Sequence, residues 1–123
     1  MKVLVVDDSP AIFTMVSLML EDRGHNSVWA EDGVQAVSIL AATKGIDIIL
    51  LDWNMPNMNG LEFLEKNVKE NFTNIPIIIM SGENSPSFIK KVQSLSVSEF
   101  IVKPFSQDVL FNTFSLANLM HNF

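Results

Sequence analysis

The feature that most limits the fold of this chain is a short apolar run, Ile48 to Leu51, that ends in a single carboxylate, Asp52. A turn signal, Asn59-Gly60, follows shortly after it. A short, wholly apolar run of this kind is typical of a strand that is buried on both faces, as in a parallel sheet covered by helices. Asp52 is then expected at the carboxyl end of a central strand, where ligands bind in open α/β sheets.

Runs of strand length alternate with segments of helical periodicity along the chain. The expected strands are Val3–Val6, Val28–Ala30, Ile48–Leu51, Pro76–Met80 and Glu99–Val102. Helices are expected after each strand. Four of them have start signals, which are Ser9-Pro10, Asp32-Gly33, Ser85-Pro86 and Ser106, and the third is marked by the spacing of Leu61, Leu64 and Val68. Five strands alternating with five helices predict an α/β fold, a parallel sheet with helices on both faces, as one domain over residues 1–123.

The composition of the 123 residues limits the classes of function. The formal net charge of -6 argues against direct binding to nucleic acid, which usually requires a basic face. The absence of cysteine excludes disulfides, a thiolate catalyst and Cys-ligated zinc. No apolar stretch reaches the ~18 residues that span a membrane, and no signal peptide is visible before Asp7. We therefore expect a cytoplasmic protein without membrane insertion.

Chemically active side chains stand at the carboxyl ends of four expected strands. Asp7 and Asp8 follow the first strand, Asp52 the third, Ser81 the fourth and Lys103 the fifth. Because parallel strands end along one edge of a sheet, these side chains are expected to meet there. Three close carboxylates repel one another, so at least one should have a raised pKa unless a cation such as Mg²⁺ is bound. A phosphoryl group on Asp52 would meet the metal, the Lys103 ammonium and the Ser81 hydroxyl, an arrangement suited to phosphoryl transfer.

Four motifs resemble those of the receiver domains of two-component response regulators, most closely the single-domain chemotaxis regulator type. They are VVDDSP (residues 5–10), LLDWNMPNMNGLEFL (50–64), IIMSGE (78–83) and FIVKPF (100–105), and the likeness covers essentially the whole chain. The resemblance implies a flavodoxin-like sheet of strand order 2-1-3-4-5 with five helices on both faces. It also implies a phosphorelay switch that receives its phosphoryl group from a histidine kinase or a histidine phosphotransfer protein. Such a switch is not a metabolic enzyme, since it catalyses only its own phosphorylation and dephosphorylation.

The resemblance implies roles for the residues at the strand ends. Asp52 would be the phosphoacceptor, and Lys103 would pair with the phosphoryl group. Mg²⁺ would be held by Asp7, Asp8, Asp52 and the backbone carbonyl of Asn54. The peptide bond that follows Lys103 is expected to be cis.

The resemblance also assigns residues that would govern switching and signal lifetime. Ser81 and Phe100 would be the hydroxyl and the aromatic ring that switch together. Asn54 and Glu83 would tune hydrolysis of the aspartyl phosphate. Gly82 departs from the family, which often has Ala there, and we expect it to loosen the switch loop.

The last helix carries more apolar residues than a surface helix needs. No Lys, Arg, Asp or Glu occurs from Val109 to Phe123, and several apolar residues fall off the stripe expected to face the core. We expect the fourth helix, fifth strand and fifth helix to form an output face for a downstream protein or a second copy of the chain. The residues expected on this face are Phe88, Phe100, Phe111, Leu116 and Leu119.

Three alternatives stand beside the single-domain switch. The chain could be a receiver domain cut from a larger regulator with a DNA-binding or enzymatic output domain. A haloacid-dehalogenase-type phosphatase also uses a strand-end Asp and Mg²⁺, but it requires a second Asp at the position of Asn54. A flavodoxin-like electron carrier requires a Ser/Thr-rich phosphate loop after the first strand, where Asp7-Asp8 would repel the flavin phosphate.

Overall fold

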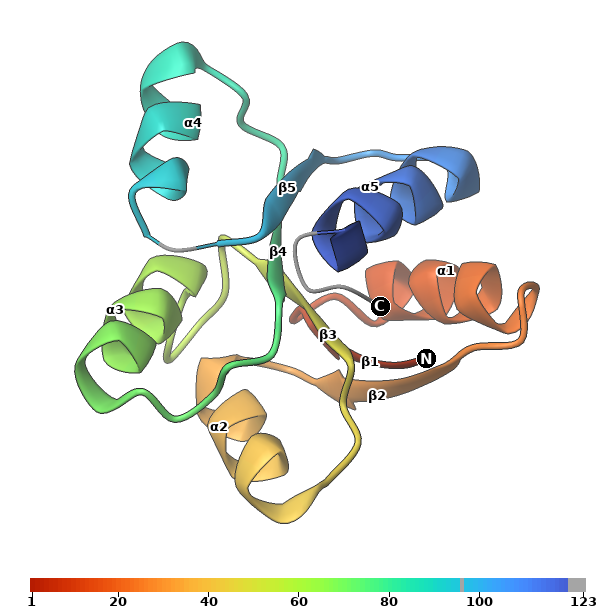
Figure 1. Cartoon of the computed structure of the whole chain (residues 1–123), viewed down its shortest axis with the longest axis horizontal. Coiled ribbons are helices and arrows are strands. Elements are labelled where there is room, and N and C mark those ends of the chain that lie inside the picture. Colours follow the sequence, from red (N-terminus) through yellow and green to blue (C-terminus); the bar gives the residue numbers. More distant parts are fainter. Residues whose placement is uncertain (96, 120–123) are drawn as a thin grey trace.

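The protein, described by a computed structural model over residues 1–95 and 97–119, is built on one five-stranded parallel sheet. Its strands are β1 Lys2–Val6, β2 Asn26–Ala30, β3 Ile48–Asp52, β4 Ile77–Ser81 and β5 Glu99–Val102. They lie in the order β2-β1-β3-β4-β5 (Figure 1). The predicted flavodoxin-like order is therefore confirmed. The strand β2 begins two residues earlier than expected, because Asn26 and Ser27 pair with the start of β1.

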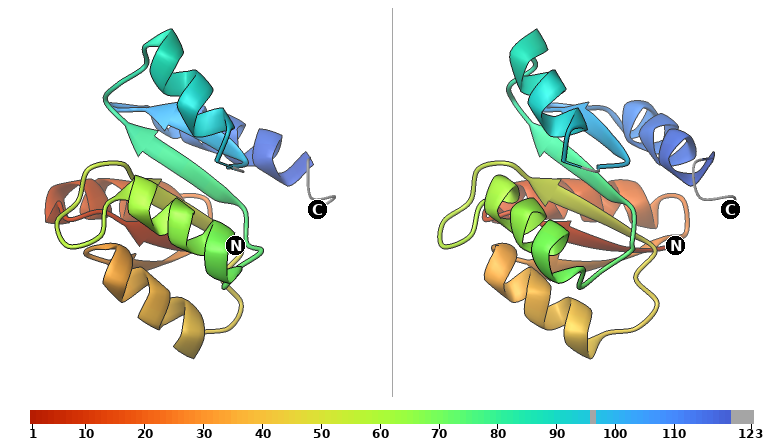
Figure 2. Two further views of the ribbon diagram at one scale, coloured as in Figure 1. Left: turned by 90° about the vertical axis from the view of Figure 1, so that its left-hand side faces the viewer. Right: turned by 60° about the vertical axis from the view of Figure 1, so that its left-hand side comes forward.

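Five helices cover the two faces of the sheet. They are α1 Pro10–Glu21, α2 Gly33–Ala42, α3 Gly60–Glu70, α4 Pro86–Gln93 and α5 Gln107–Leu119, the side chains of residues 118 and 119 lying outside the description. Helices α1 and α5 pack on one face, and α2, α3 and α4 pack on the other (Figures 1 and 2). No helix in the described ranges is long and apolar enough to cross a membrane.

The alternation of side chains along each strand divides the core into two layers. In β1, Val3 and Val5 join the layer under α1 and α5, whereas Leu4 and Val6 join the layer under the other three helices. Every residue of β3 and β4 is buried, which explains why their sequences are continuous apolar runs. These two strands are central, so their carboxyl ends are surrounded by neighbouring strands.

Side-chain caps begin the helices where the sequence predicts. Ser9, Asp32 and Ser85 each accept a hydrogen bond from a backbone N–H in the first turn of α1, α2 and α4. Asn59 forms a capping box with Glu62 at the start of α3. The helices therefore begin directly behind the strand ends, and the connecting loops are held close to that edge of the sheet.

Gly60, the first residue of α3, lies against the end of β3. A Cβ atom at this position would be 2.7 Å from the carbonyl oxygen of Asp52 and 3.0 Å from the Cα of Trp53. Both neighbours are backbone atoms, which cannot move aside without shifting the strand end. We expect Gly60→Ala to lower the free energy of unfolding by about 1–3 kcal/mol, as overpacking does.

The matched control is Gly82→Ala, because nothing lies within 4 Å of a Cβ built there. We expect this substitution to change the free energy of unfolding by less than ~0.5 kcal/mol. Urea denaturation of both variants measures the difference. Equal losses at the two positions would contradict the close approach at Gly60.

Candidate functional site

Three carboxylates meet at the carboxyl edge of the sheet, as the sequence predicts. Asp7, Asp8 and Asp52 each place one carboxylate oxygen within 4.8 Å of the others. The register explains the meeting, because Val6 of β1 pairs with Leu51 of β3 and the next residue of each chain segment is an Asp. Asp7 and Asp52 are buried and Asp8 is exposed. The cluster is therefore anchored in the core and open to solvent on one side.

Lys103 joins this cluster from the far side of β4. Its Nζ donates hydrogen bonds to Asp7 Oδ2 at 2.8 Å and to Asp52 Oδ1 at 2.9 Å. Its backbone N–H donates to the carbonyl of Ser81 at 2.8 Å, which fixes the residue beside the end of β4. The peptide bond that follows Lys103 is cis, as expected. One ammonium thus bridges two buried carboxylates from different strands.

Burial and hydrogen bonding shift the pKa values of Asp52 and Lys103. Burial raises the pKa of the Asp52 carboxyl, and the charge of Asp7 adds to the rise, although the hydrogen bond from Lys103 opposes it. The expected raised pKa is thus found, but its largest cause is burial and not repulsion among the carboxylates. Burial acts to lower the pKa of Lys103, yet its hydrogen bonds to Asp7 and Asp52 outweigh this effect and hold it above the ordinary value.

The donor set at this edge suits a hard divalent cation. With all four groups ionised, a single ammonium faces three carboxylates, so negative charge remains uncompensated. The available donors are carboxylate oxygens, which are the ligands that Mg²⁺ prefers. Asp8 is exposed, so the cluster leaves room for the water ligands that Mg²⁺ usually retains.

The other expected site residues lie around this cluster without joining it. Ser81 ends β4 and is buried, and its Oγ accepts a hydrogen bond from the N–H of Glu83 at 2.9 Å. Glu83 and Asn54 are exposed in the loops after β4 and β3. The backbone N–H of Asn54 acts to lower the pKa of the Asp52 carboxyl. Phe100 lies on β5 and is half-buried against the layer under α2, α3 and α4.

Two aromatic contacts at the site were not foreseen. The indole N–H of Trp29 donates to the carbonyl oxygen of Asp7 at 2.8 Å, and its ring stacks on Phe13 with centroids 5.1 Å apart. Trp53, which follows Asp52 directly, packs edge-on against Phe88 with centroids 5.1 Å apart. Periodicity can show that such rings are partly buried, but it does not show what they touch.

Two of the five residues expected on the output face are placed differently. Phe88 is buried at 6% exposure, because α4 turns it inward onto Trp53, so the expectation that it is open to a partner is wrong. Phe111 is half-buried against the layer under α1. The Arg23 guanidinium lies 4.3 Å from its ring centroid and the His25 ring 5.6 Å away, because α5 packs beside α1. It therefore faces the loop that links α1 to β2.

The remaining members of that expected face have different exposures. Leu116 on α5 is 53% exposed, whereas Phe100 is half-buried. The side chain of Leu119 lies outside the described residues. The core stripe expected on α5 is confirmed, since Leu110 and Phe114 are buried in the layer shared with α1.

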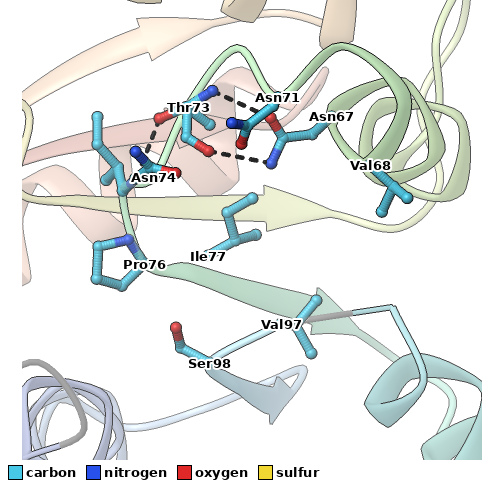
Figure 3. Close-up of a pocket in the computed structure, with 10 residues that line it drawn as sticks. Asn67, Val68, Asn71, Thr73, Asn74, Pro76, Ile77, Val97 and Ser98 are labelled. Carbon is cyan, nitrogen blue, oxygen red and sulfur yellow. Dashed lines mark hydrogen bonds between the residues drawn. The ribbon is translucent and has the colours of Figure 1, made fainter.

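A separate cavity of about 560 Å³ opens at the opposite edge of the sheet, near the first residues of β4 and β5 (Figure 3). Its wall is stiffened by Asn67, whose side-chain amide exchanges two hydrogen bonds with the backbone of Thr73. None of its lining residues is ionisable. The carboxylate cluster is therefore the site with the capacity for acid–base or metal chemistry, and the cavity lies away from it.

Comparisons with known proteins agree with this geometry. The model of the response regulator receiver domain family matches residues 3–115. The chain is 41% identical over 113 residues to the CAI-1 autoinducer sensor kinase/phosphatase CqsS of Vibrio cholerae, but these are 90% of this chain and only 16% of that protein. It is 37% identical over 112 residues to a chemotaxis protein CheY homologue of Campylobacter jejuni, covering 89% of this chain and 86% of the relative. A crystal structure of chemotaxis protein CheY4 of Vibrio cholerae matches with a TM-score of 0.82 and 34% identity, over 93% of this chain and 95% of that one.

The buried charge of Asp52 should destabilise the metal-free protein at neutral pH. Because its pKa is raised in the folded state, the folded protein binds the proton more tightly than the unfolded chain. The contribution of Asp52 to the free energy of unfolding should therefore fall as the pH rises from the unfolded pKa of about 3.9 through the raised pKa. We expect Asp52→Asn to raise the free energy of unfolding at pH 7 by on the order of 1 kcal/mol, and to have no such effect below about pH 3.9.

Thermal unfolding without divalent cations, followed from about pH 3 to pH 8, measures this difference. Glu65→Gln is the control, because Glu65 is an exposed carboxylate on α3, and it should shift stability by less than ~0.5 kcal/mol. A loss of stability in Asp52→Asn at pH 7 would show that the ionised carboxylate is favourable in the fold.

Proposed function

The chain belongs to the response regulator receiver domain family, and we propose that Asp52 accepts a phosphoryl group so that the protein acts as a signalling switch. The observation that carries this proposal is the Lys103 ammonium, which bonds both buried carboxylates at 2.8 and 2.9 Å. It holds a positive charge where a phosphoryl group on Asp52 would place its negative oxygens. We regard residues 1–123 as one such domain, acting in the cytoplasm.

Asp52 would act as the nucleophile in the transfer. One of its carboxylate oxygens forms a bond to phosphorus, while the bond from phosphorus to the donor histidine nitrogen breaks and its electron pair stays on that nitrogen. Asp7, Asp8, Asp52 and the backbone carbonyl of Asn54 would hold Mg²⁺, which neutralises charge on the transferring oxygens when bound. The donor would be a histidine kinase or a histidine phosphotransfer protein.

Lys103 and Ser81 would then respond to the new group. The ammonium, now 2.9 Å from Asp52 Oδ1, would move onto a phosphoryl oxygen. The Ser81 hydroxyl, which now accepts from Glu83, would donate to another. Phe100 stands on the strand beside β4 and is only half-buried, which supports a change in its burial when the loop after Ser81 moves.

The same edge would also set how long the signal lasts. Asn54 and Glu83 are both exposed and polar, one in each loop that flanks Asp52. They would orient a water molecule for attack on the aspartyl phosphate. We therefore expect a short-lived phosphoprotein, and the protein would be its own catalyst for both phosphorylation and hydrolysis.

The likeness to CqsS supports a second arrangement for the same chemistry. The matching stretch is only 16% of that sensor kinase/phosphatase, so a domain of this kind can serve within a much larger protein. In that arrangement the domain would pass or receive a phosphoryl group inside an assembly. In either arrangement, Asp52 and its neighbours keep the roles proposed above.

Incubation with acetyl phosphate and Mg²⁺ tests the phosphoacceptor. We expect one phosphoryl group per chain, mapped to Asp52 by mass spectrometry, and none in Asp52→Ala or in the presence of a chelator.

Lys103→Met should slow phosphorylation by roughly 10²-fold, because it removes the charge that meets the phosphoryl oxygens. Lys90→Met is the matched control, since Lys90 is exposed on α4, and should phosphorylate at the wild-type rate. Labelling of Asp52→Ala, or labelling without a divalent cation, would contradict the proposal.

The output face is proposed to bind a downstream protein or a second copy of the chain when Asp52 is phosphorylated. Leu116, at 53% exposure on α5, is its best-placed described residue. We expect sedimentation velocity to show self-association when a phosphoryl mimic is bound at Asp52, and Leu116→Glu to weaken it by on the order of tenfold because a charge enters an apolar contact. Val34→Glu on α2, at 50% exposure, is the control. A monomer in both states would contradict the self-association, and equal losses in both variants would contradict this choice of face.

A further inference from the structure

The loop that follows β3, residues 53–59, is tied to the start of α2. Asn57 Nδ2 donates a hydrogen bond of 2.7 Å to Asp32 Oδ2, across 25 residues of sequence. The N–H of Gly33 donates to the carbonyl oxygen of Met58 at 3.2 Å. Two neighbouring residues of the loop thus contact two neighbouring residues at the helix start, one pair through side chains and one through the backbone.

Asp32 can both cap α2 and bind the loop. It is buried at 6% exposure, and its Oδ1 caps α2 by accepting from the N–H of Gln35 at 2.9 Å. Its other oxygen is the one that accepts from Asn57. A carboxylate offers two acceptor oxygens, whereas a Ser cap offers one on a shorter side chain. The cap of α2 therefore uses only Oδ1 of Asp32, and Oδ2 is available to bind the loop.

The loop is shaped to reach that point. Asn57 has a backbone φ of 65°, in the left-handed region that Asn tolerates better than most residues. Met58 fills the space where a side chain at position 33 would lie, since a Cβ on Gly33 would be 2.7 Å from Met58 Cγ. The two segments are therefore in direct contact as well as hydrogen-bonded.

The near end of this loop is Asp52 itself. The N–H of Gly60 donates to the carbonyl of Trp53 at 3.0 Å, which closes the loop at its base. The backbone N–H of Asn54 lies close enough to the Asp52 carboxylate to help lower its pKa. With its base closed and its tip held at Asn57 and Met58, the loop has little freedom to carry Asn54 away from Asp52.

We propose that Asp32 and Asn57 form a latch that positions the loop after β3, so that the backbone of Asn54 stays at the Asp52 carboxylate and is ready for Mg²⁺. This inference rests on the proposed function, since it names a positioning pair for the same site. Neither residue is among those proposed to hold the metal or to contact the phosphoryl group. Their effect is exerted through the loop, as residues behind metal ligands commonly act.

Two variants break the latch in different ways. Asn57→Gly removes the amide but keeps a residue that accepts a positive φ. Asp32→Ser keeps a good cap for α2 but is too short to reach Asn57 as well. The exchange Asp32→Asn with Asn57→Asp restores a donor facing an acceptor and keeps the net charge of the wild type. It is the rescue variant.

Amide hydrogen exchange of Gly33, followed by NMR without metal, reports the latch directly. The first N–H groups of a helix have no partner within the helix, so protection at Gly33 depends on the carbonyl of Met58. We expect exchange at Gly33 to be on the order of tenfold faster in Asn57→Gly and Asp32→Ser, and near the wild-type rate in the exchanged pair.

Mg²⁺ titration, followed by tryptophan emission in a Trp29→Phe background, and phosphorylation by acetyl phosphate report the positioning. Both breaking variants should lose on the order of tenfold in Mg²⁺ affinity and phosphorylation rate, and the exchanged pair should recover both. Faster exchange at Gly33 with wild-type affinity and rate would overturn the inference, because the latch would then be structural only. Failure of the exchanged pair to recover would also overturn it. A wild-type protein that neither binds Mg²⁺ nor becomes phosphorylated would instead contradict the proposed function itself.

Discussion

The structure depends on one ammonium placed between two buried carboxylates. Asp7 and Asp52 come from adjacent strands, and burying both charges would be costly if Lys103 did not reach them. Lys103 can do so only because β1, β3 and β5 run in the same direction and end at one edge. The parallel order, the buried central strands and the loops behind them all serve to bring these three side chains together. The remaining negative charge, with Asp8 open to solvent, makes this edge chemically suited to a divalent cation.

Much of this arrangement could be predicted because it follows from local rules. Uniform apolar runs mark β3 and β4 as central, and Ser9, Asp32 and Ser85 mark helix starts through their own side chains. The rule that parallel strands end at one edge brings Asp52 and Lys103 together without further information. The strand order itself came from the resemblance to receiver domains, and membership of that family removes the phosphatase and flavodoxin alternatives.

The rest could not be predicted because it depends on contacts between distant segments. Helical periodicity identifies the stripe of α5 that faces the sheet, but it does not show that α1 lies beside this helix and that Arg23 lies over the ring of Phe111. Phe88 was placed on the surface for a similar reason, since nothing local shows that Trp53 is its neighbour. The bond between Asp32 and Asn57 spans two loops that carry no shared pattern. In each case the contact partner lies on a segment that is distant in sequence, so a local pattern cannot identify it.

The order of the strands also determines which strands lie at the edges of the sheet. It leaves β2 and β5 at the two margins of the sheet, where an outer row of backbone groups in the described ranges faces no further strand. Long, flat edge strands can pair with strands of other chains, which can begin aggregation. Here β5 has only four residues and begins with Glu99, and β2 begins with the polar pair Asn26-Ser27. The arrangement that gathers the charged residues at one end of the sheet thus leaves short, polar-tipped margins at its sides.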